Sequence, residues 1–187
     1  MLYRLAASSD AEALIRLNAA FNEVDDVSPE DVRLSLSHSA EVVVIAEADS
    51  MVVGFCCAQV HHSFCYRAPV AEVTEMYVDA AFRRKGCAQG LLAFLEEHLR
   101  SVHGVDELHL LTGTGNLPAQ SAYKKAGFAV KNEVYMMKEV SANVDITGIC
   151  GYNRSVILDK YAPAEMQVLC TARGKYPRRL KGAVTHG

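Results

Sequence analysis

A basic turn from Arg83 to Gly90 carries the residues of this 187-residue sequence that are best suited to chemistry. It follows a β-branched run, Val70–Val78, and precedes apolar residues at helical spacing. The first N–H groups of a helix have no intrahelical partner, and the helix dipole adds partial positive charge there. Because Gly86 allows close backbone approach, the turn is suited to holding a phosphate. Neither the P-loop nor the dinucleotide-binding glycine spacing is present.

Two segments together resemble the signatures of one enzyme family. Arg83-x-x-Gly86-x-Ala88 is similar to the Arg/Gln-x-x-Gly-x-Gly/Ala signature of the GNAT superfamily of acyl-CoA-dependent N-acetyltransferases. The segment from Asn116 to Phe128 resembles that family's Asn-x-x-Ala-x-x-x-Tyr-x-x-x-Gly-Phe signature. The resemblance covers roughly residues 1–140. It implies an α/β fold with a mixed, largely antiparallel central sheet, a splayed pair of parallel strands and flanking helices.

The resemblance also implies that acetyl-CoA is the cosubstrate. The turn would hold its pyrophosphate, the preceding strand would pair with its pantetheine arm, and Asn116 would hydrogen-bond that arm. Tyr123 would face the thioester sulfur and protonate the departing thiolate. The implied cofactor-binding residues are Met76, Tyr77, Val78, Arg83, Arg84, Lys85, Gly86, Cys87, Ala88, Gln89, Gly90, Asn116, Ala119 and Tyr123.

The attacking amine must lose a proton, and Glu72 and Glu75 are the candidate bases, acting directly or through a water. They are three positions apart, so in a regular strand their side chains point to opposite faces of the sheet. At most one of them then faces the cleft, unless a bulge intervenes. Related enzymes place an acidic residue at either position, so both stay open.

An acidic stretch suggests the acceptor. Glu23, Asp25 and Asp26 lie between the first two expected helices, a region that often walls the acceptor site in the family. Clustered carboxylates attract cations. We therefore expect a small cationic amine, by similarity to aminoglycoside N-acetyltransferases. Polyamines and a protein amine stay open, as does a non-catalytic acyl-CoA-binding module. Nucleic-acid binding through the basic segment Arg173–Lys181 has weaker support.

The expected elements alternate after an initial hairpin, which is typical of a mixed α/β sheet. Ser9 and Glu12 have capping-box spacing, and Ser28-Pro29 begins a second helix that runs to about Ser37. The expected strands are Leu2–Ala6, Glu41–Ala48, Met51–His61, Val70–Val78, Leu108–Thr112, Phe128–Lys131 and Val134–Lys138, followed by Ser155–Asp159 and Met166–Thr171. A long helix carries Leu91 to Val102, and a short one spans Pro118–Ala126.

Composition limits the other classes. The net charge is −3, but residues 1–140 carry 12 basic and 19 acidic residues, whereas residues 141–187 carry 7 and 3. We therefore expect an acetyltransferase domain over 1–140 and a basic extension over 141–187. No apolar run suits a membrane span or a secretory signal, so a cytoplasmic protein is expected. The six cysteines lack metal-site spacing, so no metal is expected. A homodimer is expected from the resemblance alone.

Overall fold

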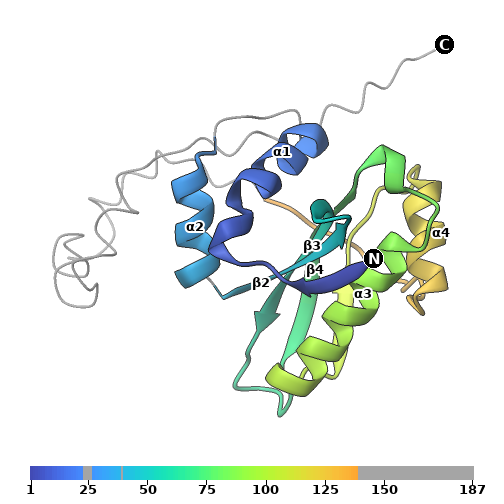
Figure 1. Cartoon of the computed structure of the whole chain (residues 1–187). Coiled ribbons are helices and arrows are strands. Elements are labelled where there is room, and N and C mark those ends of the chain that lie inside the picture. Colours follow the sequence, from blue (N-terminus) through green and yellow to red (C-terminus); the bar gives the residue numbers. More distant parts are fainter. Residues whose placement is uncertain (23–26, 39, 139–187) are drawn as a thin grey trace, which may run out of the picture. The chain divides into compact units, whose positions relative to one another are not determined.

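The fold is described by a computed structural model that covers residues 1–22, 27–38 and 40–138 (Figure 1). The chain divides into a unit of residues 1–133 and a second unit that begins at Val134. The elements of the first unit are β1 (Leu2–Leu5), α1 (Ala11–Asn22), α2 (Pro29–His38), β2 (Glu41–Ala48), β3 (Met51–His61), β4 (Val70–Val78), α3 (Cys87–His98), β5 (Glu107–Leu110) and α4 (Leu117–Lys125).

The five strands form one sheet in the order β1-β2-β3-β4-β5. Neighbouring strands are antiparallel except for β4 and β5, which are parallel. The turn between β2 and β3 places Asp49 and Ser50 at φ 49° and 61°, the left-handed geometry that suits a two-residue hairpin turn. The predicted α/β fold is confirmed, and so are the bounds of β2, β3 and β4.

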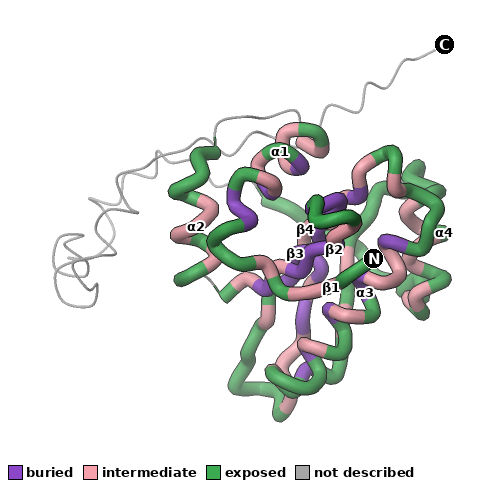
Figure 2. The backbone as a smooth tube through the Cα atoms, viewed as in Figure 1, coloured by how far each residue is buried: buried purple, intermediate pink, exposed green. Residues whose placement is uncertain are grey.

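Helices cover both faces of the sheet (Figure 1). On one face, Leu91, Leu95 and Leu99 of α3 and its π-helical continuation pack on apolar side chains of β2, β3 and β4. On the other, Leu14 and Leu17 of α1 pack on a second apolar cluster, to which α2 also contributes. In Figure 2 the buried residues accordingly lie along the central strands and in α1 and α3. This arrangement gives β4 one face toward α3 and one toward α1 and α2.

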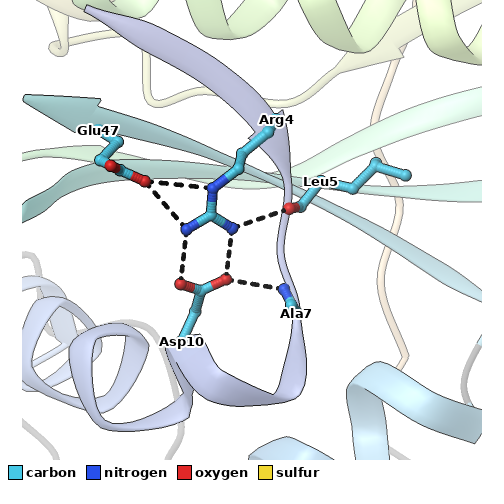
Figure 3. A network of polar contacts seen from close by, with 5 residues as sticks. All are labelled: Arg4, Leu5, Ala7, Asp10 and Glu47. Carbon is cyan, nitrogen blue, oxygen red and sulfur yellow. Dashed lines mark hydrogen bonds and ion pairs between the residues drawn. The ribbon is translucent and has the colours of Figure 1, made fainter. Parts of the chain in front are cut away.

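A partly buried ion pair joins the start of α1 to the sheet (Figure 3). The Arg4 guanidinium donates to both Asp10 carboxylate oxygens, at 2.7 and 2.9 Å, and to Glu47 at 3.0 and 3.2 Å. Asp10 also accepts the Ala7 N–H at 2.7 Å. Asp10 is only 6% exposed, and its bonds to Arg4 hold the pKa of its carboxyl below the usual range. The network ties β1, β2 and α1 together.

The start of the first helix and the bounds of the fifth strand differ from the expectation. Asp10, not Ser9, makes the bond that starts the first helix, and Glu12 instead pairs with Arg33. The fifth strand spans Glu107–Leu110 rather than Leu108–Thr112.

Phe128–Lys131 and Val134–Lys138 are not strands. Their apolar residues favour strands, but a strand needs a pairing partner, and Val130 and Met136 are 80% and 86% exposed. The short strands expected beyond residue 140 lie outside the described residues.

We predict that Asp10→Asn destabilises the protein by about 1–3 kcal/mol at neutral pH, because the negative charge and one of the two acceptor oxygens are lost beside Arg4. Since the folded pKa of Asp10 is lowered, its contribution is present above the unfolded value, about 3.9, and is lost as the pH falls through the folded value. Urea unfolding of both proteins should therefore show a gap that narrows below about pH 4. Asp49→Asn, in the exposed hairpin turn, is the control, and an equal loss there would contradict the prediction.

Candidate functional site

The turn before α3 has the backbone geometry of an anion site. Arg84 and Gly86 adopt left-handed conformations, at φ 60° and 80°, and Gly86 is the N-cap of α3. Successive N–H groups in such a turn form a concave nest that binds anions. Cys87, Ala88 and Gln89 are the first helical residues, so their N–H groups have no acceptor within the helix. A Cβ on Gly86 would meet nothing within 4 Å, so the conformation, rather than the space, requires glycine there.

Two of the basic side chains of the turn lie beside aromatic rings. Arg83 Nε donates to the Val78 carbonyl at 2.8 Å, and its guanidinium lies 5.4 Å from the centre of the Tyr77 ring. Lys85 Nζ lies 5.3 Å from the centre of the Phe82 ring. Arg83 thus braces the end of β4, and both cations stay at the turn.

Gly90 lies in the first turn of α3, against the ring of Tyr3. Its N–H donates to the Gly86 carbonyl at 3.0 Å, so it is already used inside the helix. A Cβ on Gly90 would lie 2.0 Å from Cζ and 2.2 Å from the hydroxyl oxygen of Tyr3. The structure therefore uses Gly90 to admit the Tyr3 ring against α3, and leaves Cys87–Gln89 as the candidate amide donors.

Strands β4 and β5 form a fork. Val70–Val73 pair in parallel with Glu107–Leu110, and the pairing ends at Val73 and Leu110. Strand β4 continues to Val78 with β3 as its remaining partner in the described structure. The edge of β4 from Thr74 to Val78 is thus the place where an extended chain can add as a strand.

A bulge in β4 lies at the vertex of this fork. Glu75 is opposite Cys57 and Val73 is opposite Ala58, so Thr74 has no partner in β3. An extra residue of this kind shifts the alternation of the side chains that follow it. The consequence is that Glu72 and Glu75 lie on the same face.

The register identifies that face. Glu72 is opposite Gln59 and Glu75 is opposite Cys57, and these two β3 residues are two positions apart. Cys57 belongs to the apolar cluster under α1 and α2. Both carboxylates were expected to lie on one face of the sheet only if the strand had a bulge, and β4 contains that bulge. His61 Nε2 lies 3.9 Å from a Glu72 oxygen.

Glu41 is a third carboxylate on this face, and sequence analysis missed it. It is opposite Gln59 and two positions from Val43, which packs in the same cluster. Burial, and then the charge of Glu75, raise the pKa of Glu41. Burial, followed by Glu41, Cys56 and Glu75, raises the pKa of the Cys57 thiol. Alternation along Glu41, Val43 and Ile45 was the available signal, but one carboxylate at a strand end does not stand out.

Tyr123 approaches the fork from the α3 side. It is partly buried in the cluster that includes Met76 and Leu110, and its ring centre lies 5.9 Å from that of Phe128. Burial is the main cause that raises the pKa of the Tyr123 phenol, followed by Cys56 and Glu75. The phenol is therefore protonated at neutral pH, as a proton donor to a thiolate requires.

The second signature segment packs against the first. Asn116 caps α4, where its side-chain oxygen accepts the Ala119 N–H at 3.3 Å. Gln89 Nε2 of α3 lies 3.5 Å from the Ala122 carbonyl of α4. Gln120, which sequence analysis did not single out, holds the loop before α4 through the carbonyls of Gly113 and Thr114, at 3.0 and 2.9 Å.

The acidic loop expected to wall the acceptor site falls on Glu23, Asp25 and Asp26, which lie outside the described residues. Of its neighbours, Asp31 caps α2 through Ser28, and Glu30 pairs with Arg33 at 3.5 Å. Among the described residues, no group of three or more His, Cys, Asp or Glu side chains is placed to hold a metal ion. None of the described helices is long and apolar enough to span a membrane.

Comparisons with known proteins identify the family and the fold. Residues 11–128 match the Acetyltransferase (GNAT) family. An aminoglycoside acetyltransferase from an uncultured soil metagenomic sample, solved with sisomicin, is 18% identical over 75% of this chain and 95% of its own, with a TM-score of 0.66.

A ribosomal-protein-alanine N-acetyltransferase from Brucella melitensis biovar Abortus 2308 is 19% identical over 74% of this chain and all of its own, with a TM-score of 0.64. A comparison with curated protein sequences finds no match. The match over residues 11–128 shows that the chain belongs to the GNAT family of acetyltransferases, which use acetyl-CoA as cosubstrate.

We predict that Gly90→Ala destabilises the protein by about 1–3 kcal/mol through overpacking against Tyr3, although alanine is the better helix former. In a Tyr3→Ala background the same change should be neutral or stabilising, which a double-mutant cycle of unfolding free energies measures. Equal costs in both backgrounds would refute the contact. If the Tyr3→Ala/Gly90→Ala protein folds but no longer binds CoA, Gly90 serves the pyrophosphate after all.

Proposed function

We propose that the chain transfers an acetyl group from acetyl-CoA to the primary amine of a small cationic acceptor, by direct attack within a ternary complex. The observation that carries this proposal is the order of three features along β4. The nest at Arg84–Gly86 follows the end of the strand that is unpaired with β5, and the other end of this unpaired edge is the fork vertex, next to Glu75, whose charge acts on Tyr123.

The residues at the turn fit the charged part of acetyl-CoA. The pyrophosphate is held by the N–H groups of Cys87, Ala88 and Gln89, with the charges of Arg84 and Lys85 nearby. Backbone groups of Met76 and Val78 pair with the pantetheine arm as an added strand. The side-chain oxygen of Asn116 is used to cap α4, and its side-chain NH2 group donates a hydrogen bond to the arm.

Two groups of the chain then transfer protons, a carboxylate as the base and Tyr123 as the acid. A carboxylate takes a proton from the acceptor ammonium, directly or through a water, and the neutral nitrogen attacks the acyl carbon. The C–N bond forms and the C–S bond breaks, and Tyr123 gives its proton to the thiolate. The nitrogen then loses its second proton as the amide forms, and that proton restores the phenol of Tyr123 through solvent. Positioning at the fork accounts for much of the rate, as in other reactions that bring two bound reactants together.

Glu75 is the better supported of the two candidate bases. It lies next to the bulge, beyond the end of the β4–β5 pairing, and its charge reaches the Tyr123 phenol. Glu72 lies within the paired part of β4 and close to His61. In the proposed mechanism Glu75 is therefore the base, and Glu72 contributes negative charge to the acceptor side.

The cationic acceptor is supported by charge on one face of the sheet. Glu41, Glu72 and Glu75 share the face toward α1 and α2. The acidic residues Glu23, Asp25 and Asp26 follow α1 in the sequence. A structural neighbour solved with sisomicin is an aminoglycoside acetyltransferase, which is consistent with this class of amine.

Replacement of Tyr123 by Phe tests whether the protein is an enzyme with this acid. We expect turnover to fall about 10²- to 10⁴-fold while CoA binding is retained, because only the hydroxyl proton is removed. Thiol release and calorimetric CoA titration measure the two effects. Tyr66→Phe, at an exposed tyrosine, is the matched control. Unchanged turnover in Tyr123→Phe would remove this residue from the chemistry, and no turnover in the unmodified protein would favour a binding module.

A panel of amines tests the acceptor and the base together. Thiol release should be fastest with aminoglycosides or polyamines and slow with peptides that begin with alanine, and the reverse order would favour a protein acceptor. With the best amine, Glu75→Gln should lower kcat/KM about 10²-fold or more at neutral pH, with recovery at higher pH, where the free amine is more abundant. Glu72→Gln is the paired variant, and a larger loss there would reassign the base.

A further inference from the structure

Thr74 is the residue of β4 that pairs with neither neighbouring strand. It has no register partner in β3, because of the bulge, and none in β5, because the pairing ends at Val73. Its side-chain oxygen exposes less than 1 Å² and has no hydrogen-bond partner in the described part of the chain. A buried polar atom without a partner costs free energy and calls for an explanation.

The fork supplies that explanation. An extended arm that enters from the turn and adds to the edge of β4 passes Val78 and Met76 in order. It cannot pass Val73, because Leu110 closes the fork there. Thr74 to Val78 spans about 13 Å at the rise of a β-strand. The reactive end of the arm therefore stops beside Thr74.

We propose that the Thr74 hydroxyl donates a hydrogen bond to the acyl carbonyl oxygen of the bound thioester. This inference rests on the proposed function and adds one contact to it. The hydroxyl satisfies its own hydrogen-bonding capacity, fixes the carbonyl at the vertex and draws electron density from the acyl carbon. The hydroxyl oxygen is covered in the structure, so the contact requires the arriving arm to displace part of that cover.

A purely structural threonine does not account for this arrangement. Valine has the same shape, is at least as favourable in a strand and leaves no orphan hydroxyl. If the hydroxyl had no ligand, its removal would cost nothing. Both interpretations therefore expect Thr74→Val to be at least as stable as the unmodified protein, and they differ only in the effect on binding of acetyl-CoA.

Calorimetric titration of acetyl-CoA and of CoA separates the acyl contact from the rest of the cosubstrate and needs no acceptor. We expect Thr74→Val to weaken acetyl-CoA binding about 3- to 10-fold, the effect of one neutral hydrogen bond, and to leave CoA binding unchanged. Thr74→Ser, which keeps the hydroxyl, should bind both ligands as the unmodified protein does. Thr74→Val should unfold at the same temperature or a higher one.

Two results would overturn the inference: equal binding of acetyl-CoA by Thr74→Val and the unmodified protein, or an equal loss for acetyl-CoA and CoA. If the unmodified protein binds neither ligand, the proposed function itself fails, and the contact fails with it. These outcomes are distinguishable because the first two are differences between variants and the last is seen without any substitution.

Discussion

The site depends on one local event, the loss of both of β4's regular partners within two residues. Val73 is the last residue of β4 paired with β5, and Thr74 is the bulged residue opposite β3. With a regular register, Glu72 and Glu75 would point to opposite faces. With continued pairing, β5 would close the edge of β4 that the proposed pantetheine arm needs. The extra residue thus sets the direction of the carboxylates at the point where the edge opens.

The basic turn before α3 depends on a second constraint, the sharp reversal of the chain between β4 and α3. Asp79 anchors the reversal, because its N–H donates to the Val53 carbonyl at 2.9 Å and its carboxylate accepts the Ala81 N–H at 3.0 Å. Arg83 then turns back onto Val78, and Gly86 supplies the left-handed residue that starts α3. The helix N-terminus consequently follows directly on the open edge of β4.

Sequence reasoning located most elements but not the details that shape the site. The strands β2, β3 and β4 were predictable because β-branched runs and the turn residues between them are local signals. The bulge was not, since Thr74 also suits a regular strand and the shift depends on pairing with Cys57 and Ala58. At Phe128–Lys131 the sequence predicts a strand that does not form. Apolar composition favours a strand there, but a strand also requires a pairing partner. Glu41 was missed because its neighbourhood is created by strands distant in sequence.

In the proposed mechanism, the acid and the base act on one thioester from opposite faces of the sheet. Tyr123 packs with the cluster on the α3 side, whereas the register places Glu75 on the side of α1 and α2. Strand β4 lies between these faces, and the fork is where a bound group meets both. In the proposed reaction, the amine arrives on the acidic side and the thiolate forms toward the phenol. Since the phenol's raised pKa keeps it protonated and Glu75 lies across the strand, each proton has its own route.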